Sequence, residues 1–158
     1  MANEDAIPDL ETVKEILDQA ELKHLVDDEG DLFAAWDGYR VYFVFQSMGE
    51  DGGQPFFSVR VFYDRRYGPA ERPRLLDAAD EWNRNALWPK VYTYAHEDES
   101  LQMIGEAHLI LGPGMDPTQF AVSLISWVGA AAEFDQWLAA RLGLEPKAAD
   151  ATDEEDGS

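Results

Sequence analysis

The chain has 158 residues, of which 46% are hydrophobic and 12% are aromatic. This length suffices for one domain with a substantial core and is too short for two comfortable ones. The 32 acidic and 12 basic residues give a formal net charge of −20, which repels the phosphates of nucleic acids and the headgroups of anionic membranes. The absence of cysteine excludes disulfides, thiol catalysis and thiolate metal sites. We therefore expect no direct binding to nucleic acid or membranes, and a preference for partners with basic patches.

The N-terminal stretch MANEDAIPDLE contains neither a basic region nor an apolar region of the kind that begins a secretory signal. No apolar run approaches the length that spans a bilayer. The sequence thus predicts a cytoplasmic protein.

The first half of the chain predicts one helix and four strands. Apolar residues recur at helical spacing over 9–23, after a Pro-Asp start. Short strands are expected at 24–27 and 32–37, split by the turn DDEGD. Aromatic and β-branched residues alternate over 39–46 and again over 55–64, and the polar loop between them suits a hairpin.

The second half predicts a helix, two strands and a long final helix. An apolar stripe at helical spacing runs through 69–87, and strands follow at 89–96 and 101–111. The break GPGMDP opens a helix over 118–142, and the acidic segment 145–158 is expected to be a disordered tail outside a domain of residues 1–144. The order α-ββββ-α-ββ-α predicts an α+β fold with a mainly antiparallel sheet packed by helices.

The two central strands carry apolar side chains on both faces. A sheet covered on one side should alternate apolar with polar residues, yet the nominally outward positions include Tyr42, Val44, Phe56 and Phe62. We expect part of this outward face to be covered by a second copy of the chain, by a client protein, or by the final helix.

The final helix has an apolar arc wider than one contact requires. Phe120, Leu124 and Val128 define one stripe, whereas Val122 and Ile125 lie well around the helix from it. Two interpretations stay open: the helix is wedged deep in its own core, or the excess arc forms a subunit interface.

No residue pattern indicates a catalytic or metal site. His96 lies beside three acids, but HEDES reads as a solvated hairpin turn, and His96 and His108 are poorly placed to share an ion. DDEGD lacks the alternating acids of a calcium loop and is better read as a turn. No nucleophile motif or phosphate loop occurs. We expect a protein that is not an enzyme, with no cofactor and no metal.

The stretch DEWNRNALWPKVYTY at 80–94 is rich in side chains that could be functional. Trp82 falls on the helix stripe, asparagines 83 and 85 can end the helix, and Pro89 forces an extended backbone. Only Arg84 and Lys90 could be recognising something, and either could pair with a neighbouring acid. We interpret this stretch as a structural joint between a helix and a strand.

The same stretch also carries a resemblance. LLDAADEWNRNALWPKVY, after a strand ending in FYDRR, resembles the YbjN family of small bacterial proteins, which are described as putative sensory transduction regulators. The resemblance covers roughly residues 10 to 142 and implies a fold similar to type III secretion chaperones, commonly as a homodimer. No catalytic residues are established for the family, so none is carried over. Its most specific part is E-W-N-x-x-x-x-W-P-K, here Glu81, Trp82, Asn83, Trp88, Pro89 and Lys90.

Two functional hypotheses follow. The first is a non-enzymatic, chaperone-like adaptor or regulator that acts as a homodimer and binds a partner protein, which is basic or itself binds nucleic acid. The second is a small-molecule or metal-binding sensor with a pocket between the sheet and the final helix. For the first hypothesis, the candidate contact residues are Tyr42, Val44, Phe56, Phe62, Tyr92 and Tyr94.

Overall fold

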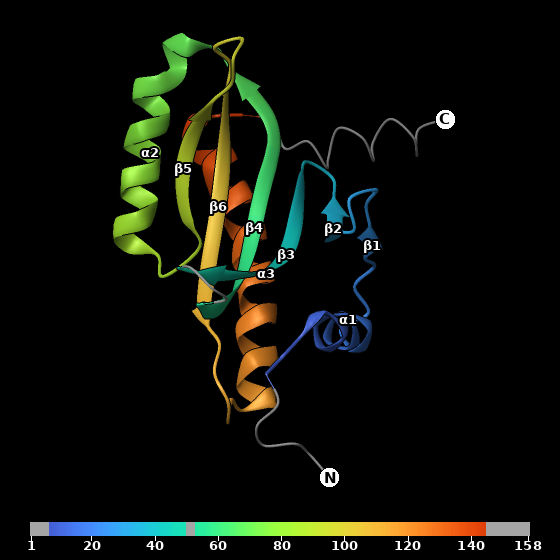
Figure 1. Ribbon diagram of the computed structural model, residues 1–158. Coiled ribbons are helices and arrows are strands. Elements are labelled where there is room, and N and C mark those ends of the chain that lie inside the picture. The colour runs from blue at the N-terminus through green and yellow to red at the C-terminus, as the bar shows by residue number, and fades with distance from the viewer. Residues whose placement is uncertain (1–6, 50–52, 145–158) are drawn as a thin grey trace.

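The computed structural model of the chain describes residues 7–49 and 53–144. Within this part, helices pack against one six-stranded sheet (Figure 1). The elements, in chain order, are α1 (Leu10–Gln19), β1 (Leu25–Val26), β2 (Leu32–Trp36), β3 (Tyr39–Met48), β4 (Gln54–Tyr67), the 3-10 turn η1 (Pro69–Glu71), α2 (Arg72–Asn85), β5 (Lys90–Ala95), β6 (Leu101–Ile110) and α3 (Pro117–Leu142).

The strand order is β1-β2-β3-β4-β6-β5, and every neighbouring pair is antiparallel. β3 and β4 form the longest pairing, which runs without a register shift from Tyr39 opposite Tyr63 to Met48 opposite Gln54. In Figure 1, α3 lies behind the sheet and α2 lies beside β5, which forms one edge. The sequence prediction of an α+β fold in this element order is confirmed.

All three helices pack on the same face of the sheet. Every second residue of the central strands, such as Val41 and Val59, belongs to one buried core cluster. That cluster also contains Leu17 from α1, Leu75 from α2 and Phe134 from α3, whereas the intervening strand residues are absent from it. The burial of this continuous apolar layer supplies the main driving force for folding.

Local chemistry sets where the helices begin and end. α1 starts with a capping box in which Asp9 Oδ1 accepts from Thr12 N at 3.0 Å. It ends at Gln19, earlier than the predicted residue 23, because Glu21 adopts a left-handed backbone with φ 59°. α3 starts after Asp116 and ends at Gly143, whose φ of 70° suits glycine. The expected tail at 145–158 lies outside the described residues.

The structure decides only in part between the two interpretations of the wide apolar arc of α3. Phe120, Leu124 and Val128 are buried in the protein's own core. Val122 and Ile125 remain 52% and 37% exposed, so the interpretation of a helix wedged deep on all sides is wrong for this part of the arc. Of the three alternatives for what covers the outward face of the sheet, the final helix is wrong, because α3 packs on the opposite face.

Candidate functional site

The second face of the sheet, turned away from the three helices, is the candidate functional site. Within residues 7–49 and 53–144, no helix packs on it, and we call it the open face. Its side chains come from alternate positions of four neighbouring strands, in register with one another. The open face consists of Arg40, Tyr42, Val44, Phe56, Ser58, Arg60, Phe62, Lys90, Tyr92, Tyr94, Ile104, Glu106 and His108.

The structure places all of the predicted contact residues on this one face. The Tyr42 ring stacks on Phe33 at 5.3 Å between centroids and meets the edge of Phe62 at 5.6 Å. Tyr94 is 49% exposed. The others, Tyr42, Val44, Phe56, Phe62 and Tyr92, are half-buried by one another and by the polar residues between them.

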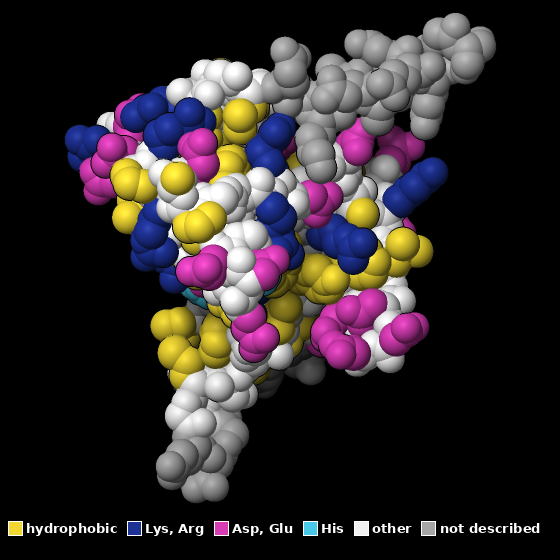
Figure 2. Space-filling model, turned by 90° about the horizontal axis from the view of Figure 1, so that it is seen from above, with side chains coloured by type: hydrophobic (Ala, Val, Ile, Leu, Met, Phe, Trp, Pro, Cys, Tyr) yellow, Lys and Arg dark blue, Asp and Glu magenta, His cyan; other side chains and the backbone are white. Residues whose placement is uncertain are grey.

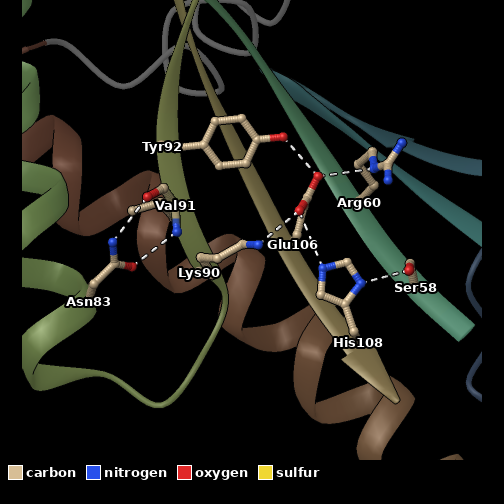
Figure 3. Close-up of polar contacts among 8 residues, drawn as sticks. All are labelled: Ser58, Arg60, Asn83, Lys90, Val91, Tyr92, Glu106 and His108. Atoms are coloured by element: carbon tan, nitrogen blue, oxygen red, sulfur yellow. Dashed lines mark hydrogen bonds and ion pairs between the residues drawn. The ribbon is translucent and has the colours of Figure 1, made fainter. Parts of the chain in front are cut away.

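Glu106 lies among these apolar side chains and is only 8% exposed. It stands directly opposite Arg60 on β4 and Lys90 on β5. Its Oε2 accepts a hydrogen bond from the Tyr92 hydroxyl at 2.8 Å and lies 3.2 Å from Arg60 Nε. Its Oε1 lies 3.3 Å from Lys90 Nζ and 3.3 Å from His108 Nε2, as Figure 3 shows. One carboxylate thus joins side chains from three strands.

The surroundings of Glu106 keep it ionised. Burial raises its pKa, but the hydrogen bond from Tyr92 and the charges of Lys90 and Arg60 together lower it below the usual 4.5. For Tyr92, burial and the hydrogen bond to Glu106 raise the pKa to about 12, so its hydroxyl remains a donor. At neutral pH, Glu106 is therefore a carboxylate and Tyr92 a neutral phenol.

His108 extends the network to Ser58. Its Nδ1 lies 2.7 Å from Ser58 Oγ. Because Nε2 faces a carboxylate, which only accepts, the neutral ring carries its proton there and accepts from the serine hydroxyl. Ser, His and Glu are the residue types of a nucleophilic triad. Ser58, however, is 0% exposed in a strand flanked by β3 and β6, so a substrate cannot reach its oxygen.

The stretch at 80–94 is a joint that fixes the start of β5. Trp82 Nε1 donates to the Pro89 carbonyl at 2.9 Å, and the Asn83 amide makes two hydrogen bonds to the backbone of Val91 (Figure 3). The prediction that Asn83 ends the helix is therefore wrong, because its side chain instead connects α2 to β5. Asn85 does satisfy a helix carbonyl, that of Glu81, at 3.0 Å.

The remaining residues of this stretch also have structural partners. Lys90 pairs with Glu106, and Arg84 lies 3.9 Å from Asp80. Trp88, which precedes Pro89 through a cis peptide bond, packs against Trp127 of α3. Each of the two cations therefore has an acidic neighbour, as the alternative interpretation expected.

Comparison with known proteins agrees with this arrangement. The family model described as "YbjN: Putative bacterial sensory transduction regulator" matches residues 9–140, well over half of the chain. The chain belongs to the YbjN family. The crystal structure of YbjN, described as a putative transcription regulator from E. coli, superimposes with a TM-score of 0.58 at 17% identity, over 80% of this chain and 88% of that one. At this identity the likeness shows a shared fold alone. No curated protein matches the chain.

The open face of this YbjN protein contains a hollow of about 500 Å³. Tyr42 and Phe62 line it, together with four acids and the two cations Arg40 and Arg60; the acids are Asp27, Glu29, Asp31 and Asp64. In Figure 2, exposed hydrophobic side chains lie between groups of acidic and basic ones. The hollow combines an aromatic surface with acids around it. A long basic side chain of a partner could pack its apolar stem on the rings and place its charge near the acids.

The turn DDEGD behaves as the sequence predicts. Asp27 Oδ1 accepts from the backbone N–H groups of Glu29 and Asp31, both at 2.9 Å, as in an Asx turn. Although these three carboxylates lie close together, exposed acidic groups commonly do so without an ion. His96 and His108 have separate partners, Gln102 and Glu106 respectively. Within the described residues, no helix is long and apolar enough to cross a membrane.

Sequence reasoning missed the polar half of the YbjN open face. Glu106 is the only charged residue of the strand segment LQMIGEAHLI, and a lone acid in an apolar strand is a signal of a buried pair. Its partner Arg60 could not be named, because it depends on the register of β4 with β6, which are separated in sequence by α2 and β5.

Proposed function

We propose that this YbjN protein is a non-enzymatic adaptor or regulator that binds a partner protein through its open face. The observation that carries the proposal is that the six predicted contact residues lie on one face that no described helix covers. A half-buried aromatic surface of this kind supplies binding energy when a partner completes its burial.

The charge distribution favours a partner with basic side chains. The hollow beside Tyr42 and Phe62 has the acids Asp27, Glu29, Asp31 and Asp64 around it. It also has two cations, of which Arg60 is paired with Glu106 and Arg40 lies over the Phe33 ring at 5.6 Å, so acids outnumber cations around it. With a formal net charge of −20, the whole chain would also steer such a partner toward itself.

Site-specific photo-crosslinking in the host cell tests this proposal. A photoreactive phenylalanine analogue is placed at Phe62 or Tyr92, and as a control at Leu76, which is 44% exposed on α2. We expect covalent adducts with another polypeptide at the two open-face positions and not at Leu76. Adducts of equal yield at all three positions, or none at the open face, would contradict the proposal.

The homodimer is a separate part of the proposal. The exposed Val122 and Ile125 on α3 offer a second apolar surface, on the helical side of the molecule. Sedimentation at low micromolar concentration is expected to show a species of twice the 17.8 kDa chain mass. A monomer at that dilution would contradict an obligate dimer.

One observation favours a second candidate function, that of a small-molecule sensor. A cavity of about 460 Å³ lies between α3 and the strands, lined by Trp36, Tyr39, Tyr67 and Leu138 among others. Its volume lies within the range of ligand pockets. A thermal-shift screen with common metabolites and divalent metals tests it, since a ligand of this cavity would raise the melting temperature. An unchanged melting temperature throughout the screen would count against this function.

A further inference from the structure

The two edge strands of the sheet, β1 and β5, are protected from pairing with another chain. On β5, the Asn83 amide binds both the N–H and the C=O of Val91, and α2 lies alongside (Figure 1). On the other side, β1 is only two residues long and is followed by the acidic turn at 27–31. Short strands, covering helices and charges are the usual means by which proteins prevent pairing with another chain.

Within residues 7–49 and 53–144, a third stretch of strand edge has no such protection. β3 is ten residues long, but β2 pairs only with its first half, from Tyr39 to Phe43. The second half, Val44 to Met48, pairs with β4 alone. Its sequence VFQSM contains no charge and no proline, and its register with β4 shows no bulge.

The hydrogen-bonding direction of each residue follows from the far edge of the sheet. The N–H and C=O of Val91 point outward to Asn83, so Lys90 and Tyr92 bond to β6. In an antiparallel strand, successive residues direct their backbone N–H and C=O groups to opposite sides. Applied in turn to β6, β4 and β3, this rule directs the backbone groups of Val44 and Gln46 toward β4. Phe45 and Ser47 therefore point their backbone groups away from the sheet. Among the described residues, neither makes a backbone hydrogen bond to another element.

A groove beside this edge indicates what could pair with it. The groove has a volume of about 380 Å³ and is lined by Asp9, Leu10, Asp31 and Phe45 among others, with no lysine or arginine. The hydrogen bonds from Thr12 lower the pKa of Asp9, so it carries its negative charge at neutral pH. The segment 1–6 of this chain contains Glu4 and Asp5 and is therefore mismatched in charge.

We propose that an extended, basic segment of a partner protein pairs with Val44–Met48 as an added strand, with its backbone bonded to Phe45 and Ser47 and its cations near Asp9 and Asp31. Main-chain hydrogen bonds supply affinity in this mode, and alternate side chains supply specificity. The edge shares Val44 with the open face and Asp31 with the hollow in that face, but the outward backbone groups of Phe45 and Ser47 lie outside that face. The inference can therefore be tested separately from the proposed function, through Ser47.

The test uses fluorescein-labelled peptides of twelve residues and fluorescence anisotropy. One peptide alternates lysine with valine, a second alternates glutamate with valine, and a third alternates lysine with glycine to match charge without strand propensity. We expect the lysine–valine peptide to bind the full chain most tightly. Ser47→Pro, which removes an outward N–H without removing a bond to β4, should weaken that binding at least about tenfold. Ser47→Ala, which keeps the N–H, should leave it unchanged.

Amide hydrogen exchange supplies a second measurement that does not depend on a variant. On binding of the lysine–valine peptide, the amides of Phe45 and Ser47 should become protected, whereas those of Val44 and Gln46 are already protected by β4. Asp9→Asn removes a charge that lines the groove and not the hollow, and it keeps a residue that can cap α1. It should weaken binding of the lysine–valine peptide several-fold and serves as a second variant, with circular dichroism to check that both variants fold.

Two results would overturn the inference. Equal binding to Ser47→Pro, with binding lost in Tyr42→Ala, would place the peptide on the open face and leave the edge unused. A dimer of the free chain that Ser47→Pro dissociates would show that a second copy, and not a basic partner segment, occupies the edge.

Discussion

The side-chain amide of Asn83 forms two hydrogen bonds with the backbone of Val91. Its Nδ2 donates to the Val91 carbonyl and its Oδ1 accepts from the Val91 N–H, both at 3.0 Å. An amide side chain on α2 thus takes the place that a further strand would occupy at the edge of β5. This contact ties helix to sheet immediately beside Lys90, whose side chain pairs with Glu106.

Asn83→Ala should destabilise the protein by about 1–2 kcal/mol, because it removes two partly buried hydrogen bonds and leaves both backbone groups of Val91 without that partner. The measurement is urea unfolding followed by fluorescence. Asn83→Asp keeps the acceptor for the Val91 N–H and loses the donor to the Val91 carbonyl. Its free energy of unfolding should therefore lie between those of Asn83→Ala and the unmodified chain. Equal stability of Asn83→Ala and the unmodified chain would show that water replaces the amide without cost.

Gly105→Ala should destabilise the protein by about 1–3 kcal/mol through overpacking. An added Cβ would lie 3.3 Å from both Cβ and Cγ of Pro89, a rigid ring, and 3.6 Å from Tyr63 Cε2. Gly112→Ala is the matched control, since a Cβ there meets nothing within 4 Å, and it should change the free energy of unfolding by less than about 0.5 kcal/mol. If the two variants unfold at the same urea concentration, Pro89 does not constrain position 105.

The order of helices and strands could be predicted from the sequence because the spacing of apolar residues that marks each element is contained within that element. Alternation over 39–46 and helical spacing over 118–142 each correspond to an observed element, β3 and α3. The helix end at Gln19 was missed because the left-handed backbone at Glu21 occurs at a residue that seldom adopts it. The role of Asn83 was misassigned because its partner, Val91, lies beyond the helix.

The open face was half predictable for a similar reason. Alternation along one strand assigns Tyr42 and Phe62 to the same side, so the apolar contact residues could be named. The Glu106 network joins β5 and β6, which form a hairpin, to β4, which is separated from them by α2 in sequence, and no local pattern encodes the register of β4 with β6. The unpaired half of β3 depends on the difference in length between β2 and β3, which a prediction accurate to a few residues cannot give.

Gly129→Ala should stabilise the isolated chain by about 0.5–1 kcal/mol, because glycine in a helix interior loses more backbone entropy on folding than alanine. A Cβ at this exposed position of α3 meets nothing within 4 Å. Thermal unfolding at two protein concentrations is the measurement. Destabilisation that grows with protein concentration would instead indicate that a second copy packs against this side of α3, near Val122 and Ile125.

Glu106→Gln should destabilise the protein at neutral pH by about 1.5–3 kcal/mol, the usual value of hydrogen bonds to a charged group, since it leaves Arg60 and Lys90 without their carboxylate. The folded pKa of Glu106 is lowered below 4.5, so its ionised form stabilises the folded state. This stabilisation is fully present above the unfolded pKa of about 4.5 and is lost as the pH falls through the folded value.

The difference in free energy of unfolding between the unmodified chain and Glu106→Gln should therefore be constant from pH 7 to about pH 5 and shrink below about pH 4. Urea unfolding at a series of pH values measures it. Glu81→Gln is the control, because its partner Arg141 and the carboxylate are both well exposed, and it should cost less than about 1 kcal/mol at any pH. A difference that persists unchanged to low pH would mean that Glu106 acts through the shape of its side chain and not through its charge.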